Sequence, residues 1–472
     1  MGNKALVFIR NFSYAISSNL VSLIVSILVI LIIPKILGVK DYGYLQLYLF
    51  YSSYVGFLHF GWNDGIYLRY GGKEYKDLDK KLFFSQFYML LLFQTLIVLF
   101  IFSFSEIFIE NADRKFIFQM TAFGLLITNV SLMLSFILQV TNKIKEYAQN
   151  TLIGRILYFS FIIIFIFIGV KDYKLIIVAD LIGKLISFML AVYYCRDIVF
   201  RKISTFYFSL KETIENINVG IRLMFANIAS MLIIGVVRFG VERSWDISTF
   251  GKVSLTLNIS NFVMIFINTI GIIIYPVLRR TSEKRLPDIY VTIRDFLMVI
   301  LLAILIAYFP LNAILSTWLP KYTDSLHYMA LLLPMCIYEG KTALLTNTYL
   351  KTLRKEIVML KINIISLLLS VVSTLFTTIL LQNLNLAIAS IVFLLVIRSI
   401  LTELYLSRLL GISIYKDVLL ESIMTIYFIL TAWYINSWLT VIVYIVAYLI
   451  YLAFKKKDII NMTKRIRSLI KS

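Results

Sequence analysis

Cysteine and histidine are almost absent from this sequence. Its 472 residues include two cysteines, Cys195 and Cys336, and two histidines, His59 and His327. Both cysteines lie in apolar segments, so we expect buried thiols rather than a disulfide, and no spacing among these residues fits a metal site. The sequence therefore predicts no metal ion and no other cofactor.

Charged residues are also scarce. They form 15% of the chain, where soluble domains usually carry about a quarter, while hydrophobic residues form 60%. The mean hydropathy is +0.88. Apolar runs recur from end to end, and many reach the roughly 20 residues that cross a bilayer core. These features exclude a soluble protein and predict an all-α polytopic membrane protein with about 14 transmembrane helices.

The predicted spans follow the apolar runs. They are placed at 12–33, 44–61, 82–105, 116–140, 150–170, 175–195, 217–237, 253–278, 289–310, 325–350, 357–381, 386–409, 418–435 and 438–454.

Basic residues give the predicted orientation. With a cytoplasmic N-terminus, 29 of the 46 Lys and Arg residues lie in inner segments and 10 in outer loops, so both termini are expected to be cytoplasmic. The net charge of +20 is dispersed between spans rather than gathered on one face, which argues against nucleic-acid binding.

A weak internal repeat suggests two halves. Pro34–Gly43 follows the first span with a glycine turn and an aromatic-Gly pair, and Arg238–Gly251 follows the seventh in a similar way. We predict an N-terminal six-helix lobe (1–195), a cytoplasmic interfacial linker (196–216), a C-terminal six-helix lobe (217–409), and a terminal helix pair with a basic cytoplasmic tail (410–472). Parallel repeats of this kind occur in transporters.

Two stretches resemble a known family. Pro34–Gly43, with the sequence PKILGVKDYG, resembles the signature of polysaccharide-biosynthesis flippases, and Phe60–Tyr70 resembles their Gly-polar-Gly turn followed by a basic residue. These Wzx-type O-antigen and capsule flippases belong to the multidrug/oligosaccharidyl-lipid/polysaccharide exporter superfamily. The resemblance covers the whole chain in topology, but its motifs cluster in the first 75 residues.

The resemblance carries expectations about fold and function. It implies a MATE-like V of two helical lobes around a central, often cationic, cavity. It also implies transfer of undecaprenyl-diphosphate-linked oligosaccharide repeat units from the inner to the outer leaflet of a bacterial inner (cytoplasmic) membrane. The expected partners are the lipid-linked oligosaccharide and membrane lipids, and a polysaccharide polymerase is a candidate.

Charges inside the spans are the most informative residues, because each costs about 2.5–3.5 kcal/mol at the bilayer centre if it faces lipid. Arg155, Arg294 and Lys361 are close enough to the inner surface to extend toward it. Arg222, Lys341 and Arg398 are deeper; they either line a path for a diphosphate, which arginine grips with two parallel hydrogen bonds, or form structural ion pairs.

Other polar residues have two interpretations each. Asp180 and Lys184 are one helical turn apart and either neutralise each other or serve the substrate. Asp64 and Arg69 either meet the substrate at the inner mouth or form a local ion pair. Amides in the eighth span bind sugar hydroxyls or join helices. The full candidate substrate-binding set is Arg222, Arg398, Lys341, Lys184, Arg155, Asp64, Arg69, Asn258 and Asn261.

Enzymatic signals are poor. Gly340–Thr342 resembles the end of a phosphate-binding loop, but Met335 stands where that motif needs a further glycine. No outer loop is long enough for a catalytic domain. We predict a flippase rather than an enzyme; the alternatives are a drug or metabolite exporter of the same superfamily and a membrane enzyme acting on lipid-linked glycan.

Overall fold

The computed structural model describes residues 20–462, apart from 22, 263, 265–277, 279–282 and 436. All regular elements in these residues are helices. The chain divides into two compact units, residues 1–228 and 229–472, and the limit between them falls inside helix α9. The predicted limits of the two six-helix lobes, the linker and the terminal helix pair stay predictions.

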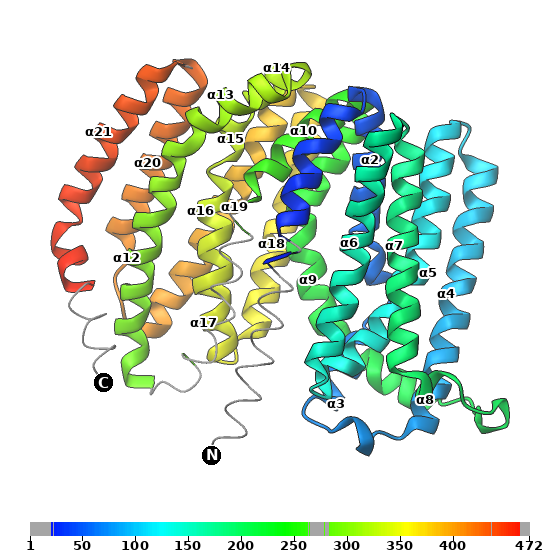
Figure 1. The fold of residues 1–472 in the computed structure, drawn as a ribbon. Coiled ribbons are helices and arrows are strands. Elements are labelled where there is room, and N and C mark those ends of the chain that lie inside the picture. The colour runs from blue at the N-terminus through cyan, green and yellow to red at the C-terminus, as the bar shows by residue number, and fades with distance from the viewer. Residues whose placement is uncertain are drawn as a thin grey trace. The chain divides into compact units, whose positions relative to one another are not determined.

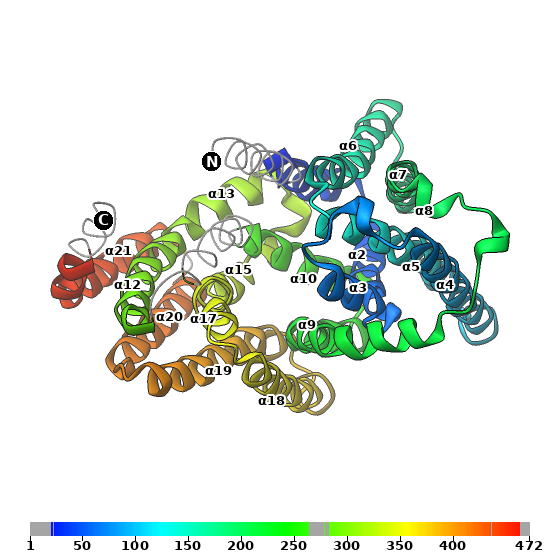
Figure 2. The ribbon, with the colours of Figure 1, turned by 90° about the horizontal axis from the view of Figure 1, so that it is seen from below.

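The first unit is a bundle of long helices (Figures 1 and 2). After an apolar helix at Leu23–Ile36, it contains α2 (Val39–Ser52), η1 (Val55–His59), α3 (Trp62–Tyr70), η2 (Tyr75–Asp77), α4 (Lys80–Phe108), α5 (Ala112–Val140), α6 (Ile144–Ile168), α7 (Tyr173–Tyr194), α8 (Arg196–Val199), η3 (Ile203–Thr205) and the first part of α9 (Leu210–Ser244). In both views α4, α5, α6 and α7 lie side by side.

The second unit holds the rest of α9 and more fragmented helices. They are α10 (Ile247–Ser260), η4 (Glu283–Arg285), α12 (Leu286–Ile304), η5 (Leu305–Ala307), α13 (Tyr308–Trp318), η6 (Pro320–Tyr322), α14 (Thr323–Leu326), α15 (Met329–Leu332), α16 (Met335–Lys341), the π-helix η7 (Thr342–Thr346), α17 (Asn347–Thr352), α18 (Glu356–Thr374), the π-helix η8 (Leu375–Leu380), α19 (Leu384–Leu410), α20 (Tyr415–Tyr434) and α21 (Trp438–Phe454).

The helices confirm a polytopic membrane protein. Nine helices in the described residues are long and apolar enough to cross a membrane, and α21 with its bent continuation Lys456–Met462 makes a tenth. Two further predicted spans, 44–61 and 325–350, are built from consecutive short helices. The remaining two, 12–33 and 253–278, extend outside the described residues, as do residues 463–472 of the predicted basic tail. Pro334 marks the break between α15 and α16, because proline cannot continue the hydrogen bonding of the preceding turn.

Side chains from neighbouring helices satisfy the backbone where the second span breaks. Between α2 and α3, the carbonyls of Val55 and Leu58 accept hydrogen bonds from Asn129 Nδ2 at 3.0 Å and Gln94 Nε2 at 3.1 Å. Asn63 in turn donates to the Asn129 carbonyl at 2.9 Å. Exposed backbone groups are costly in a bilayer, so these buried amides make the break tolerable. Helix α5 is the most buried of the candidate spans among the described residues, because it packs against α2, α3, α4 and α7.

Helix α3 packs backbone to backbone against the start of α9. A Cβ added to Gly65 would lie 1.9 Å from the Asn216 carbonyl oxygen, and one added to Gly220 would lie 2.0 Å from that of Gly61. Small residues four apart permit this close approach, as in membrane helix pairs with a GxxxG pattern. One turn further along α3, Arg69 continues the same face and pairs with Glu212 at 2.6 Å.

The close contact predicts that Gly65→Ala is strongly destabilising. The added methyl group meets backbone rather than a flexible side chain, so we expect a loss of about 3 kcal/mol, the upper end of the usual cost of overpacking. The apparent midpoint of thermal unfolding in detergent measures it. Gly56→Ala is the matched control, because a Cβ there meets nothing within 4 Å. Equal midpoints for the two variants would contradict the packing described here.

Candidate functional site

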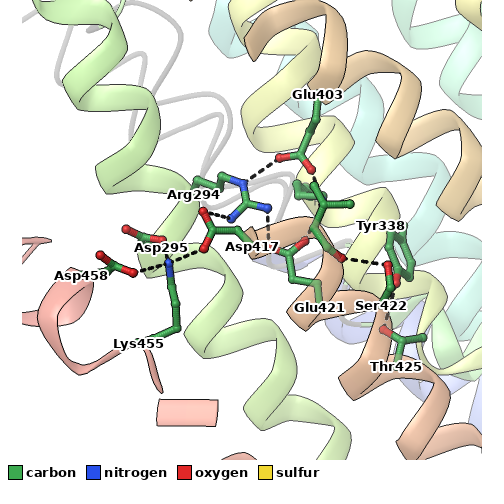
Figure 3. A network of polar contacts seen from close by, with 12 residues as sticks. Arg294, Asp295, Tyr338, Glu403, Asp417, Glu421, Ser422, Thr425, Lys455 and Asp458 are labelled. Carbon is green, nitrogen blue, oxygen red and sulfur yellow. Dashed lines mark hydrogen bonds and ion pairs between the residues drawn. The ribbon is translucent and has the colours of Figure 1, made fainter. Parts of the chain in front are cut away.

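Two cations and two carboxylates form a closed ring inside the second unit, and Figure 3 labels three of these residues, Arg294, Glu403 and Glu421. Arg294 on α12 contacts Glu403 on α19 at 2.9 Å and Glu421 on α20 at 2.6 Å. Lys341 on α16 contacts the same two carboxylates, at 2.6 and 2.8 Å. All four side chains are at most 1% exposed. Each charge is therefore balanced within the protein, and the ring joins four helices.

The ring continues into a second cluster around Lys455, at the end of α21 (Figure 3). Its ammonium lies 2.8 Å from Asp295, 2.7 Å from Asp417 and 2.9 Å from Asp458. Asp417 also approaches Arg294 at 3.5 Å. These three carboxylates balance the charge of the buried Lys455 ammonium. The cluster holds the terminal helix pair against α12.

Arg398, in the middle of α19, is also paired internally. Its guanidinium donates to Asn363 at 3.0 Å, to Glu339 at 3.1 Å and to Ser230 at 2.8 Å. Sequence reasoning left open whether Arg398 and Lys341 line a path or form ion pairs, and these contacts favour ion pairs for both. The expectation that Arg294 extends to the inner surface is wrong, because its charge is neutralised in the buried ring.

The local pairing of Asp180 and Lys184 is present in the first unit. Their side chains meet at 2.7 Å across one turn of α7. Tyr48 on α2 donates to Asp180 at 2.6 Å, which fixes the carboxylate against a second helix. Lys184 is thus a partly exposed cation whose charge is already balanced.

Asp64 and Arg69 do not pair with each other. Arg69 binds Glu212 and Glu215 on α9, the latter at 2.8 Å, and so helps to hold α9 on α3. Asp64 lies 3.7 Å from His59 Nε2, whose Nδ1 accepts from the Gly61 N–H at 3.0 Å. Burial raises the pKa of Asp64 to about 6. The proposed local ion pair is therefore wrong in its partners, although both residues do make internal contacts.

Two candidate arginines have no carboxylate partner among the residues that the structure describes. Among the described residues, Arg155 on α6 is exposed and donates only to Ser26, at 3.3 Å, and Arg222 on α9 is exposed and makes no polar contact. Arg155 lies about 14 Å along its helix from Glu146, and Arg222 about 10 Å from Glu215, at 1.5 Å per residue. Both belong to the first unit.

The predicted amide contacts lie in the second unit. Asn258 is half-buried in α10, and Asn261 is exposed at the C-terminal end of that helix. Their role in sugar binding stays a prediction. Among the described residues, no group of His, Cys, Asp and Glu could hold a metal ion.

Sequence reasoning missed the anionic half of the ring. Neither Glu403 nor Glu421 is among the residues predicted from the sequence, although both interrupt apolar runs. That interruption is a usable signal, since a carboxylate in a span needs a partner. The sequence does not indicate which cations these carboxylates bind, because Glu421 and Lys341 are 80 residues apart.

Comparison with known proteins identifies the family. A family model described as "Polysaccharide biosynthesis protein" matches residues 8–282. The chain belongs to this family. No curated protein matches the sequence of this family member. The resemblance drawn from Pro34–Gly43 and Phe60–Tyr70 is thereby confirmed.

Solved structures confirm the fold of this family member. An inward-facing multidrug resistance MATE family transporter of the MOP superfamily aligns with a TM-score of 0.64 and 11% identity, over 83% of this chain and 98% of the transporter. The lipid II flippase MurJ, in an inward closed conformation, aligns at 0.61 and 14% identity, over 96% and 100%. At these identities the likeness concerns the fold alone, which is the predicted MATE-like helical fold.

The ring predicts that Glu421→Gln is destabilising. It would leave Arg294 and Lys341 sharing one carboxylate, and breaking a buried pair typically costs about 3–5 kcal/mol. The apparent midpoint of thermal unfolding in detergent should fall clearly, whereas the exposed Glu356→Gln should change it little.

A double variant separates charge balance from packing. Lys341→Met combined with Glu421→Gln removes one charge of each sign, so it should be more stable than Glu421→Gln alone. If the double variant is instead less stable by the sum of the single effects, the ring does not act as a charge-balanced unit.

Proposed function

We propose that this protein is a flippase that transfers undecaprenyl-diphosphate-linked oligosaccharide repeat units from the inner to the outer leaflet of a bacterial cytoplasmic membrane, with both of its termini cytoplasmic. Membership of the polysaccharide biosynthesis family supports this class of substrate. The observation that carries the proposal is a pair of exposed arginines in membrane helices of the first unit, Arg155 and Arg222, which have no carboxylate partner among the described residues.

The chemistry of the two arginines suits a diphosphate. A guanidinium inside a membrane helix is stabilised when it faces water or an anion, and its planar fork can donate two parallel hydrogen bonds to phosphate oxygens. Arg155 and Arg222 supply this charge without first breaking an ion pair. Lys341, Arg398 and Arg294 would each have to give up a carboxylate, so we assign them to the framework instead.

The division of charges suggests how the lipid crosses. The diphosphate and sugars pass along protein groups that replace water, while the polyprenyl chain stays among lipid tails. The first unit then offers the contacts for the head group, and the ring of the second unit keeps α12, α16, α19 and α20 together as one body. A polysaccharide polymerase that takes up the transferred unit is a fitting partner.

Depletion of the protein in its native cell tests the proposal. We expect a complete diphosphate-linked repeat unit to accumulate on the inner leaflet while surface glycan is lost, as measured by mass spectrometry of extracted lipids and by surface labelling. A normal lipid pool with intact surface glycan would overturn the flippase assignment and point to export of a small molecule.

Charge-removing variants test the two arginines. In complemented cells, Arg222→Gln or Arg155→Gln should lower surface glycan at least about tenfold, because each removes a charge-assisted contact worth roughly 1.5–3 kcal/mol. Lys361→Gln is the matched control: Lys361 is an exposed cation near the start of α18, close enough to the helix end to reach water. Equal glycan levels in all three variants, at equal protein levels, would exclude Arg155 and Arg222.

A further inference from the structure

We infer that the connection between α8 and α9, residues 200–209, is a binding surface for the headgroups of anionic phospholipids. The inference goes beyond the proposed function, because it concerns the lipids around the protein rather than the lipid that the protein transfers. It starts from a surface that combines exposed apolar side chains with cations that have no carboxylate partner among the described residues. In the proposed topology, this surface adjoins the inner leaflet.

Helix α4 holds the connection at both ends. The Tyr88 hydroxyl donates a hydrogen bond to the Val199 carbonyl at 3.3 Å, and the Ser85 hydroxyl accepts one from the Tyr207 N–H at 3.2 Å. Between these two points the chain extends outward past α8 and then returns to the start of α9 (Figures 1 and 2). The connection therefore has a shape that the rest of the first unit supports.

The connection exposes large apolar side chains near the end of the membrane helices. Phe200 is 72% exposed, Ile203 86% and Phe208 69%. Ser85 and Tyr88, which hold the connection, lie within the first nine residues of α4. The apolar side chains thus lie near the depth of the lipid headgroups, where they can enter the acyl layer. In water the same group of side chains would form an unfavourable apolar patch.

Cations without an internal carboxylate border these apolar side chains. Lys81 Nζ lies 5.3 Å from the centre of the Tyr207 ring, and the Arg201 Nε–H is buried without a hydrogen bond to any described residue. Five cations of this region have no carboxylate partner in the part of the chain that the structure describes: Lys81, Arg196, Arg201, Lys202 and Lys211. Basic residues at this depth are attracted to an anionic leaflet.

The nearby carboxylates are already paired within the protein. Asp197 forms an ion pair with Lys80 and accepts a hydrogen bond from the Tyr75 hydroxyl at 2.6 Å. Glu212, in the first turn of α9, pairs with Arg69 at 2.6 Å. The surface is therefore positive overall. Insertion of its apolar side chains brings the cations to the headgroups, so the two contributions act together on an anionic leaflet, whereas a neutral leaflet offers only the first.

A spin label at position 203 tests the inference on the purified full-length protein in vesicles. Both native cysteines are buried, so the label reacts at Ile203→Cys, and labelled wild-type protein gives the background. Collision of the nitroxide with a water-soluble nickel chelate reports contact with water, and collision with oxygen reports contact with lipid tails. Lys76→Cys, at an exposed position of η2, is the aqueous reference. The vesicles consist of phosphatidylcholine, with or without phosphatidylglycerol.

With phosphatidylglycerol, we expect the chelate to collide with the label at 203 at least about tenfold less often than with the label at 76, because insertion removes water from the side chain. Without it, chelate collisions at 203 should rise. If the two labels collide equally with the chelate in the presence of phosphatidylglycerol, the inference is wrong and a protein partner becomes the candidate for this surface. Equal protection in both kinds of vesicle would overturn the role of anionic headgroups.

Removal of charge gives a second measurement, in which phosphatidylglycerol is titrated into the protein in detergent while the apparent midpoint of thermal unfolding is followed. In the double variant Arg201→Gln with Lys202→Gln, the concentration that gives half of the maximal rise should be at least about tenfold higher than in the wild type, because each basic residue attracts the anionic headgroup.

The matched control is Lys145→Gln with Lys351→Gln. It removes the same net charge from two exposed lysines on other helices, α6 and α17, so it should keep the wild-type concentration. An equal dependence on phosphatidylglycerol in the two double variants would show that residues 200–209 do not bind its headgroup. Neither measurement involves the transferred lipid, so both outcomes are independent of the flippase proposal.

Discussion

The cost of placing charge and open backbone in a hydrocarbon layer is the constraint on which this structure depends. Water cannot satisfy a polar group there, so each group must find a partner within the protein or face an aqueous path. The ring of Arg294, Lys341, Glu403 and Glu421 solves this for side chains. Asn129 and Gln94 solve it for the backbone of the broken second span. Polar groups that have no such partner are the ones that a substrate can contact.

The basic residues inside spans differ between the two units. In the second unit, the deep cations of α12, α16 and α19 all pair with carboxylates. In the first unit, Lys184 is neutralised by Asp180, whereas Arg155 and Arg222 have no carboxylate partner among the described residues. Basic residues of the same type thus hold helices together in the second unit, while two in the first unit present exposed charge.

Sequence reasoning predicted what hydropathy and local spacing encode. The ends of α4, α5 and α21 lie within a few residues of the expected limits, because the apolar run itself defines a spanning helix. The Asp180–Lys184 pair was foreseeable, since both residues lie on one helix. The breaks after Ser52 and Leu332 were harder to place, because hydropathy averages over a run and does not register where its helix stops. The partners within the ring could not be predicted, because they come from four helices that are far apart in sequence.

The side-chain amides that bind backbone carbonyls of the second span also constrain the order in which the chain folds in the membrane. The carbonyls of Leu58 and Val55 depend on residues 36 and 74 positions later, Gln94 and Asn129. During synthesis those residues do not yet exist when the second span first meets the membrane. Until α5 has been synthesised, the second span must therefore stay a continuous helix or remain in contact with water. Its final broken shape is therefore a late event of biogenesis, completed only when α5, the fourth predicted span, can dock against it.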